Sequence, residues 1–111
     1  MNFKDELAIT SRNLKTLRKV QPNLGAGFSA LHKASIFEGA VSVKHKELIA
    51  LAIGIARQCE DCIGFHVTDA IQAGATREEV AETIAVAVMM GGGPSFMYGA
   101  RAMDAFDQLS D

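Results

Sequence analysis

Two long segments of this sequence are apolar on nearly every side, and they restrict the fold more than any other feature. The first covers residues 48–56 and the second covers residues 84–90. Neither alternates polar and apolar residues with the period of two that a half-buried strand requires. A helix N-cap signal precedes each segment: Ser42 precedes the first, and a capping box from Thr76 to Glu79 precedes the second. We therefore predict an all-α protein in which two helices are covered on several sides.

Proline, glycine and capping residues divide the chain into about six predicted helices. Pro22 interrupts the first amphipathic segment, whose apolar stripe should pack against the rest of the protein. Gly39 and Gly74 are plausible helix stops, and a triple glycine before Pro94 marks the last junction. The expected helices cover approximately residues 2–20, 22–38, 43–58, 59–73, 77–90 and 94–109.

Size and composition restrict the classes of protein that this chain can belong to. With 111 residues, it is expected to form a single domain over residues 1–111. Two helices that are apolar all round are difficult to bury in so small a bundle, so we predict a homo-oligomer. The net charge of −2 argues against a nucleic-acid partner. An apolar run of membrane-spanning length and a leader-like N-terminus are both absent from the sequence, which predicts a cytoplasmic protein with no membrane contact.

Both cysteines of the chain lie three residues apart, as Cys59 and Cys62, and His66 follows four residues later. On a helix these three side chains share one face, which makes them a candidate redox site. The helices before and after Gln58 should form a hairpin, because almost no loop separates them. Glu47 then lies about 16 Å before the corner and His66 about 12 Å after it, at 1.5 Å per residue. The hairpin therefore predicts that Glu47 and His66 lie side by side.

Each of these four side chains suits one role in thiol chemistry. Glu47 is expected to orient the imidazole of His66 and to favour its charged form. His66 then accepts the proton of Cys62, because the thiolate is the reactive species. Cys62 would attack the substrate and Cys59 would resolve the intermediate by forming a disulfide. The two acids between the cysteines act against thiolate formation, whereas the helix N-terminus favours it. Neither a metal nor a cofactor is required.

The order of Glu47, the Cys59–Cys62 pair and His66 resembles the signature of the alkylhydroperoxidase D branch of the carboxymuconolactone decarboxylase family. The flanking segments 46–52 and 74–80 resemble that signature as well.

The resemblance extends over about residues 22–100. It implies an all-helical fold that assembles as trimers or hexamers. It also implies reduction of a small hydroperoxide by the cysteine pair, with electrons returned by another dithiol protein or a lipoyl group. The family roles fall on Cys62 as the attacking residue, on Cys59 as its partner, and on Glu47 with His66 as a proton relay.

Four other readings of the same residues remain open at this stage. Cys59, Cys62 and His66 could bind zinc, with Glu47 as a fourth ligand. His66 and Glu47 could instead serve as acid–base groups of a decarboxylase that acts on a lactone acid. The cysteine pair could exchange disulfides without any peroxide. Finally, the protein could be a helical binding module in which the cysteines are incidental.

Overall fold

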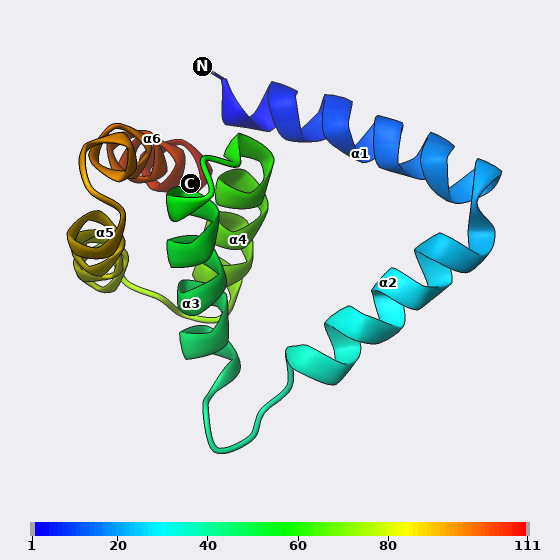
Figure 1. The fold of residues 1–111 in the computed structure, drawn as a ribbon, viewed down its shortest axis with the longest axis horizontal. Helices are drawn as coiled ribbons and strands as arrows, with labels where there is room; N and C mark the ends of the chain where they lie inside the picture. Colours follow the sequence, from blue (N-terminus) through cyan, green and yellow to red (C-terminus); the bar gives the residue numbers. More distant parts are fainter. Residues whose placement is uncertain (1, 111) are drawn as a thin grey trace.

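The computed structural model describes residues 2–110. This part of the chain contains six helices and no strand (Figure 1). The prediction of an all-α fold is confirmed. The second and third helices end two or three residues earlier than predicted. The helices are α1 Phe3–Val20, α2 Pro22–Ser35, α3 Val43–Ala56, α4 Glu60–Gln72, α5 Arg77–Gly91 and α6 Gly93–Leu109.

The helix ends follow the local signals in the sequence. The Ser42 hydroxyl accepts the His45 N–H at the start of α3, and Thr76 forms the complete capping box at the start of α5. Gly74 follows the end of α4 with a φ of +92°, which is the left-handed conformation that a glycine commonly adopts after a helix. The triple glycine was expected to mark the junction between α5 and α6, but only Gly92 lies between these helices. Its φ of +76° lets the two helices turn with a single connecting residue.

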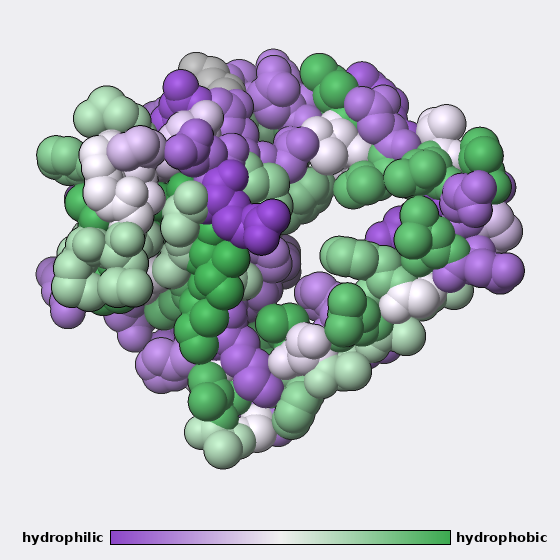
Figure 2. Space-filling model, in the orientation of Figure 1, coloured by the Kyte–Doolittle hydropathy of each residue, from purple (hydrophilic) through white to green (hydrophobic). Residues whose placement is uncertain are grey.

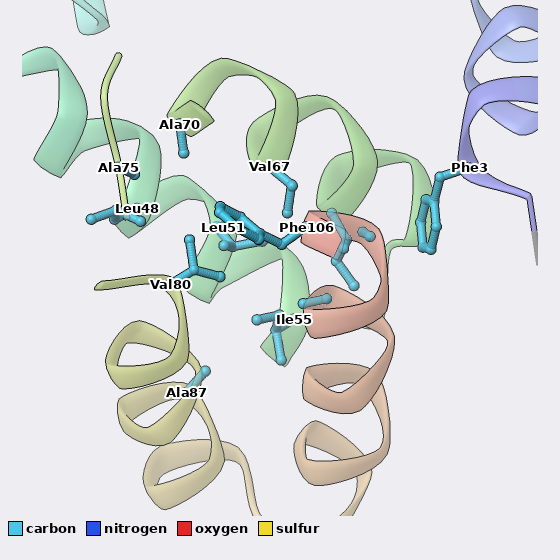
Figure 3. Close-up of a cluster of buried hydrophobic side chains, with 13 residues drawn as sticks. Phe3, Leu48, Leu51, Ile55, Val67, Ala70, Ala75, Val80, Ala87 and Phe106 are labelled. Atoms are coloured by element: carbon cyan, nitrogen blue, oxygen red, sulfur yellow. The ribbon is translucent and has the colours of Figure 1, made fainter. Parts of the chain in front are cut away.

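Helices α3, α4, α5 and α6 pack together and are called the bundle below. Their facing sides form the hydrophobic core shown in Figure 3. Burial of each large aliphatic side chain there contributes about 1.5–3 kcal/mol. Five of these side chains have no exposed surface at all: Leu51, Ile55, Ile63, Val67 and Val80. The other three helices cover only one side of the apolar segment in α3. Ile49 and Ile53 on its other side are 52 % and 54 % exposed, so the predicted cover on several sides is not found in the single chain.

The N-terminal helices are attached to the bundle only near the start of α1. Phe3 is 2 % exposed and belongs to the hydrophobic core, and the Leu7 Cδ2 lies 2.7 Å from where a Cβ on Gly64 of α4 would be. Beyond this point α1 leads away from the bundle and α2 turns back toward it (Figure 1). We call residues 11–35 the arm. The Arg18 guanidinium fastens its two helices together by donating to the Gly25 carbonyl and the Ser29 hydroxyl.

The arm exposes the apolar stripe that the sequence predicts should be packed. In the single chain these side chains edge an open gap between the arm and the bundle (Figure 2). The exposed large apolar residues of the arm are Leu14, Leu17, Val20, Leu24, Phe28 and Leu31. The far ends of the hairpin α5–α6 are also apolar and exposed, at Val86, Met89, Met90, Phe96 and Met97. Within residues 2–110, the helices are too short or too polar to cross a membrane.

Candidate active site

The corner between α3 and α4 fixes where the cysteines lie. Gln58 adopts a φ of +57°, and its N–H donates to the Ile55 carbonyl over 3.0 Å. The next N–H, that of Cys59, donates to the Gly54 carbonyl, also over 3.0 Å. This pair of bonds is the Schellman arrangement that closes a helix C-terminus. The first cysteine is therefore held by the last turn of α3 before α4 begins.

The two cysteines are joined by a disulfide at the start of α4. Their Cα atoms are 5.2 Å apart, which is within the usual range for such a bond. Cys59 is the N-cap of α4, and its sulfur accepts the Cys62 N–H over 3.2 Å. Gly54 lets α3 approach closely, because a Cβ there would come within 3.1 Å of the Cys62 Cβ. Both cysteines face a cavity of about 490 Å³ lined by Ala50, Ile53, Gly54, Arg57, Cys59, Cys62 and His66.

Glu47 and His66 meet between α3 and α4, as the hairpin geometry predicts. The Glu47 Oε1 lies 3.2 Å from the His66 Nδ1. Glu47 is 3 % exposed, whereas the His66 side chain is 25 % exposed and reaches the cavity that the cysteines line. The structure thus joins Glu47 to His66, and His66 shares its cavity with Cys59 and Cys62.

The charges of this pair differ from the prediction. Burial lowers the pKa of His66, and the electrostatic influence of His32 on α2 lowers it further, although Asp69 opposes both effects. Burial also raises the pKa of Glu47 from 4.5 to about 7. We expected the carboxylate to favour a charged imidazole, but removal of both groups from water has the larger effect. The neutral imidazole that results is the form that can accept a proton from a thiol.

Asp69 is a third member of this cluster that sequence reasoning missed. Protonated Glu47 can donate a hydrogen bond to the Asp69 carboxylate, and this bond and the negative charge of Asp69 both add to the raised pKa of Glu47. Asp69 follows His66 by three residues, and this spacing on a helix could have indicated that both side chains face Glu47.

The same cluster is the one grouping within residues 2–110 that could hold a metal ion. One ligand atom from each of Glu47, His66 and Asp69 lies within 4.8 Å of the others. Carboxylate oxygens and an imidazole nitrogen are ordinary ligands for a divalent cation. Neither cysteine belongs to this set, so it is not the zinc site that the sequence left open.

The two acids between the cysteines are both engaged by other helices. Glu60 forms an ion pair with Arg101 of α6. Asp61 accepts a hydrogen bond of 2.8 Å from the Thr10 hydroxyl of α1. The ion pair reduces the effect that the Glu60 charge has on the thiols. Arg57, which sequence reasoning also missed, lines the cavity beside the disulfide and adds a positive charge there.

Comparison with known proteins supports the family resemblance that the sequence shows. Residues 22–105 match the carboxymuconolactone decarboxylase family. A carboxymuconolactone decarboxylase family protein of Legionella pneumophila is 46 % identical, with a TM-score of 0.96 over 98 % of this chain and 97 % of that one.

Two further relatives span most of the chain. A carboxymuconolactone decarboxylase family protein of Thermotoga maritima, for which a role in the antioxidative response has been suggested, is 28 % identical. Its TM-score is 0.83 over 94 % of this chain and 89 % of that one. An uncharacterized protein of Cupriavidus necator is 37 % identical over 98 % of this chain and 96 % of its own length. The chain therefore belongs to the carboxymuconolactone decarboxylase family.

Proposed function

We propose that the protein is a thiol-dependent oxidoreductase that reduces small hydroperoxides. The observation that supports this most directly is the Cys59–Cys62 disulfide in the wall of a cavity that His66 also lines. A cysteine pair that can close into a disulfide beside an open cavity can store the two electrons that a peroxide requires. The buried Glu47 behind His66 provides a group that can hold a proton next to it.

In the first step, the reduced pair meets the hydroperoxide. Neutral His66 accepts the proton of Cys62, and the thiolate attacks the terminal peroxide oxygen. The O–O bond breaks, Cys62 becomes a sulfenic acid, and the leaving alkoxide takes the proton from the imidazolium to form an alcohol. The sulfur is oxidised by two electrons and the peroxide is reduced by two.

In the second step, Cys59 attacks the sulfenic sulfur and water leaves as the disulfide forms. The Cys59 sulfur already lies at the N-terminus of α4, where the helix dipole favours its thiolate. A dithiol protein or a lipoyl group then reduces the disulfide by exchange and restores both thiols. Dithiol donors of this kind operate in the cytoplasm, and we propose that compartment for the protein.

The relatives support a redox role without specifying the substrate. The suggested antioxidative role of the Thermotoga maritima protein is compatible with peroxide reduction. The disulfide at the cavity favours redox chemistry over a decarboxylase in which Glu47 and His66 act alone, because decarboxylation makes no use of a joined cysteine pair. Disulfide exchange without peroxide uses the same two sulfurs, so it is the alternative that the experiment must separate.

The test is peroxide consumption by the reduced protein with a panel of dithiol donors. After one equivalent of hydroperoxide, we expect mass spectrometry to show the Cys59–Cys62 disulfide. Cys62→Ser should abolish consumption, whereas Cys59→Ser should leave a sulfenic acid that dimedone traps. Thiols that stay unmodified would contradict the proposal. Turnover of dithiols with no peroxide loss would assign disulfide exchange instead.

We further propose that the protein works as a homo-oligomer, with the trimer and hexamer as the expected states. The exposed apolar side chains of the arm and of the α5–α6 hairpin support this, because monomers rarely expose apolar surface on this scale. Met89 and Met90 are 72 % and 77 % exposed in the single chain. Light scattering at micromolar concentration should give a multiple of 11.8 kDa. A mass of one chain would refute the oligomer.

A further inference from the structure

The arm carries a large share of the positive charge of the chain and none of its negative charge. Residues 11–35 contain five lysine and arginine residues and no aspartate or glutamate, so the formal charge of the arm is +5. The rest of the chain contains the other six cationic residues and all 13 acids, which gives −7. Within residues 2–110, the ion pairs all join residues outside the arm. The apolar stripe of the arm is therefore accompanied by positive charge that no acid in this part of the chain pairs with.

A groove on the outside of the α5–α6 hairpin has the opposite charge at its border. The groove has a volume of about 460 Å³ and is lined only by glycine, alanine and larger apolar residues, among them Phe96. Three exposed acids at one end of the hairpin lie one helical turn from alanines of this lining: Glu78 and Glu82 on α5, and Asp104 on α6. Arg77 at the same end is paired with Asp107, so it does not cancel their charge.

The arm of the same chain cannot cover this groove. The arm leads away on one side of α3 and α4, and the α5–α6 hairpin lies on the other side (Figure 1). Because α1 meets the bundle only near Phe3, the rest of the arm points away from the hairpin. The two complementary surfaces can therefore meet only between different molecules.

We propose that the arm of one copy docks on the α5–α6 groove of a second copy, with its cations against the acidic border of that groove. This inference rests on the proposed homo-oligomer and names the two surfaces that form it. The apolar stripe of the arm is then covered by the lining of the groove, and Lys15 and Lys33 meet Glu78 and Glu82. Because the contact joins two different surfaces, each copy gives one arm and receives one, which closes either an exchanged pair or a ring. A ring of three copies is the proposed trimer.

The choice of these two lysines follows from their places on the arm. Lys15 directly follows Leu14, which lines a hollow of about 220 Å³ in the apolar stripe of the arm. Lys33 lines a second hollow beside Phe28, which belongs to the same stripe. Both lysines are exposed, so neither is needed for the fold of the single chain. A basic apolar arm would also be attracted to an anionic membrane. The uncovered groove with its acidic border favours a second copy, because membrane binding would leave the groove exposed.

The experiment is a charge-reversal cycle that is followed by the mass of the assembly in analytical ultracentrifugation at low salt. Lys15→Glu with Lys33→Glu reverses the arm, and Glu78→Lys with Glu82→Lys reverses the groove. Each double variant should raise the dissociation constant of the assembly roughly 10- to 100-fold, because like charges then meet at the contact. The variant with all four substitutions should return to within about threefold of the unaltered protein, because the reversed charges attract each other again.

The matched control is Lys4→Glu, which makes the same change at an exposed position of α1 before the arm begins. It should leave the dissociation constant where it is. The single substitutions Lys15→Glu and Glu82→Lys repeat the cycle should a double variant fail to fold. Circular dichroism checks that each variant keeps its helices.

Three results would overturn the docking of the arm on the groove. The first is a variant with four substitutions that assembles no better than the double variants, and the second is a constant that no reversal changes. The third is an arm reversal that abolishes binding to phosphatidylserine vesicles and leaves the mass of the assembly unchanged, which would assign the arm to a membrane. If the cycle behaves as expected but the unaltered protein consumes no peroxide, the proposed chemistry fails and the docking surface stands.

Discussion

The bundle and the arm use similar helices but differ in how their apolar faces are satisfied. In the bundle, Leu51 and Ile55 have no exposed surface, because three other helices cover this side of α3. In the arm, Leu17 and Phe28 are 47 % and 60 % exposed on helices of comparable length. Helix periodicity predicts which side of a helix is apolar, but it does not specify whether this chain or another one covers it.

The proposed catalytic groups and the exposed apolar stripe of the arm lie in different parts of the molecule. The candidate active site lies entirely between α3 and α4, where packing holds Glu47 and His66 in place. Just before the arm begins, the Thr10 hydroxyl of α1 donates to Asp61 at the start of α4. The bundle thus contains the proposed catalytic groups, and the arm is part of the apolar surface that we propose a second copy covers.

The largest expected effect is on the free energy of unfolding, and it is seen when a core residue of the bundle is compared with an exposed residue of the arm. Ile55→Ala should lower the free energy of unfolding by about 2–5 kcal/mol, because it leaves a cavity among buried helices. Leu17→Ala should change it by less than about 0.5 kcal/mol in the isolated chain. Urea unfolding at low and high protein concentration measures both.

The concentration dependence makes this comparison sharper. If a second copy covers the arm, the Leu17→Ala loss should grow with protein concentration, whereas the Ile55→Ala loss should depend on it much less. Equal Leu17→Ala losses at every concentration would mean that the arm stays uncovered.

The second prediction concerns the buried acid of the bundle. The pKa of Glu47 is higher in the folded protein, about 7, than its ordinary value of 4.5. The folded state therefore binds more protons than the unfolded state between these values, and this contribution to stability is lost as pH rises through them. A shift of this size corresponds to about 3 kcal/mol. Glu47→Gln cannot lose a proton, so it should not show this loss between pH 4.5 and 7.

His66 contributes with the opposite sign, because its pKa is lower in the folded protein than its ordinary value of 6.5. Its stabilising contribution is lost as pH falls below 6.5, in the variant as in the parent protein. The difference between Glu47→Gln and the parent protein in urea unfolding therefore isolates Glu47. Leu17→Ala removes no titrating group and serves as the arm control. A constant difference across this pH range would argue against a protonated Glu47.

The smallest expected effects on stability come from replacing two glycines, one in the bundle and one in the arm. A Cβ at Gly64 would lie 2.7 Å from the Leu7 Cδ2, where α1 joins the bundle, so Gly64→Ala should cost about 1–2 kcal/mol. A Cβ at Gly27 on the arm has no atom within 4 Å, and Gly27→Ala should stabilise the helix by about 0.5–1 kcal/mol. Thermal unfolding measures both changes. Destabilisation by Gly27→Ala would indicate that a neighbouring chain approaches this face.

Much of the bundle and the site could be predicted because the signals are local. Ser42, Gly74 and the capping box at Thr76 specify helix ends through their own hydrogen bonds and backbone angles. The meeting of Glu47 with His66 follows from the constant rise of two helices and a short corner.

What could not be predicted depends on burial, which sequence spacing does not report. The charge of His66 was predicted wrongly, because loss of water outweighs the nearby acids. Asp69 was missed although its spacing from His66 places both side chains on one face of α4, because the packing of α3 on α4 decides that this face lies against Glu47. The apolar stripe of α1 was expected to be packed, and only the direction in which α1 leaves the bundle shows that it is exposed.

Because the Cys59 sulfur is also the cap of α4, the choice of substitution at this position decides what an experiment can measure. Serine can accept the same N–H bond and removes only the electron-transfer capacity. Alanine removes both, so a fall in its activity would mix a frayed first turn with lost chemistry. Sequences that give up redox function while keeping this fold should therefore favour serine, aspartate or asparagine at this position.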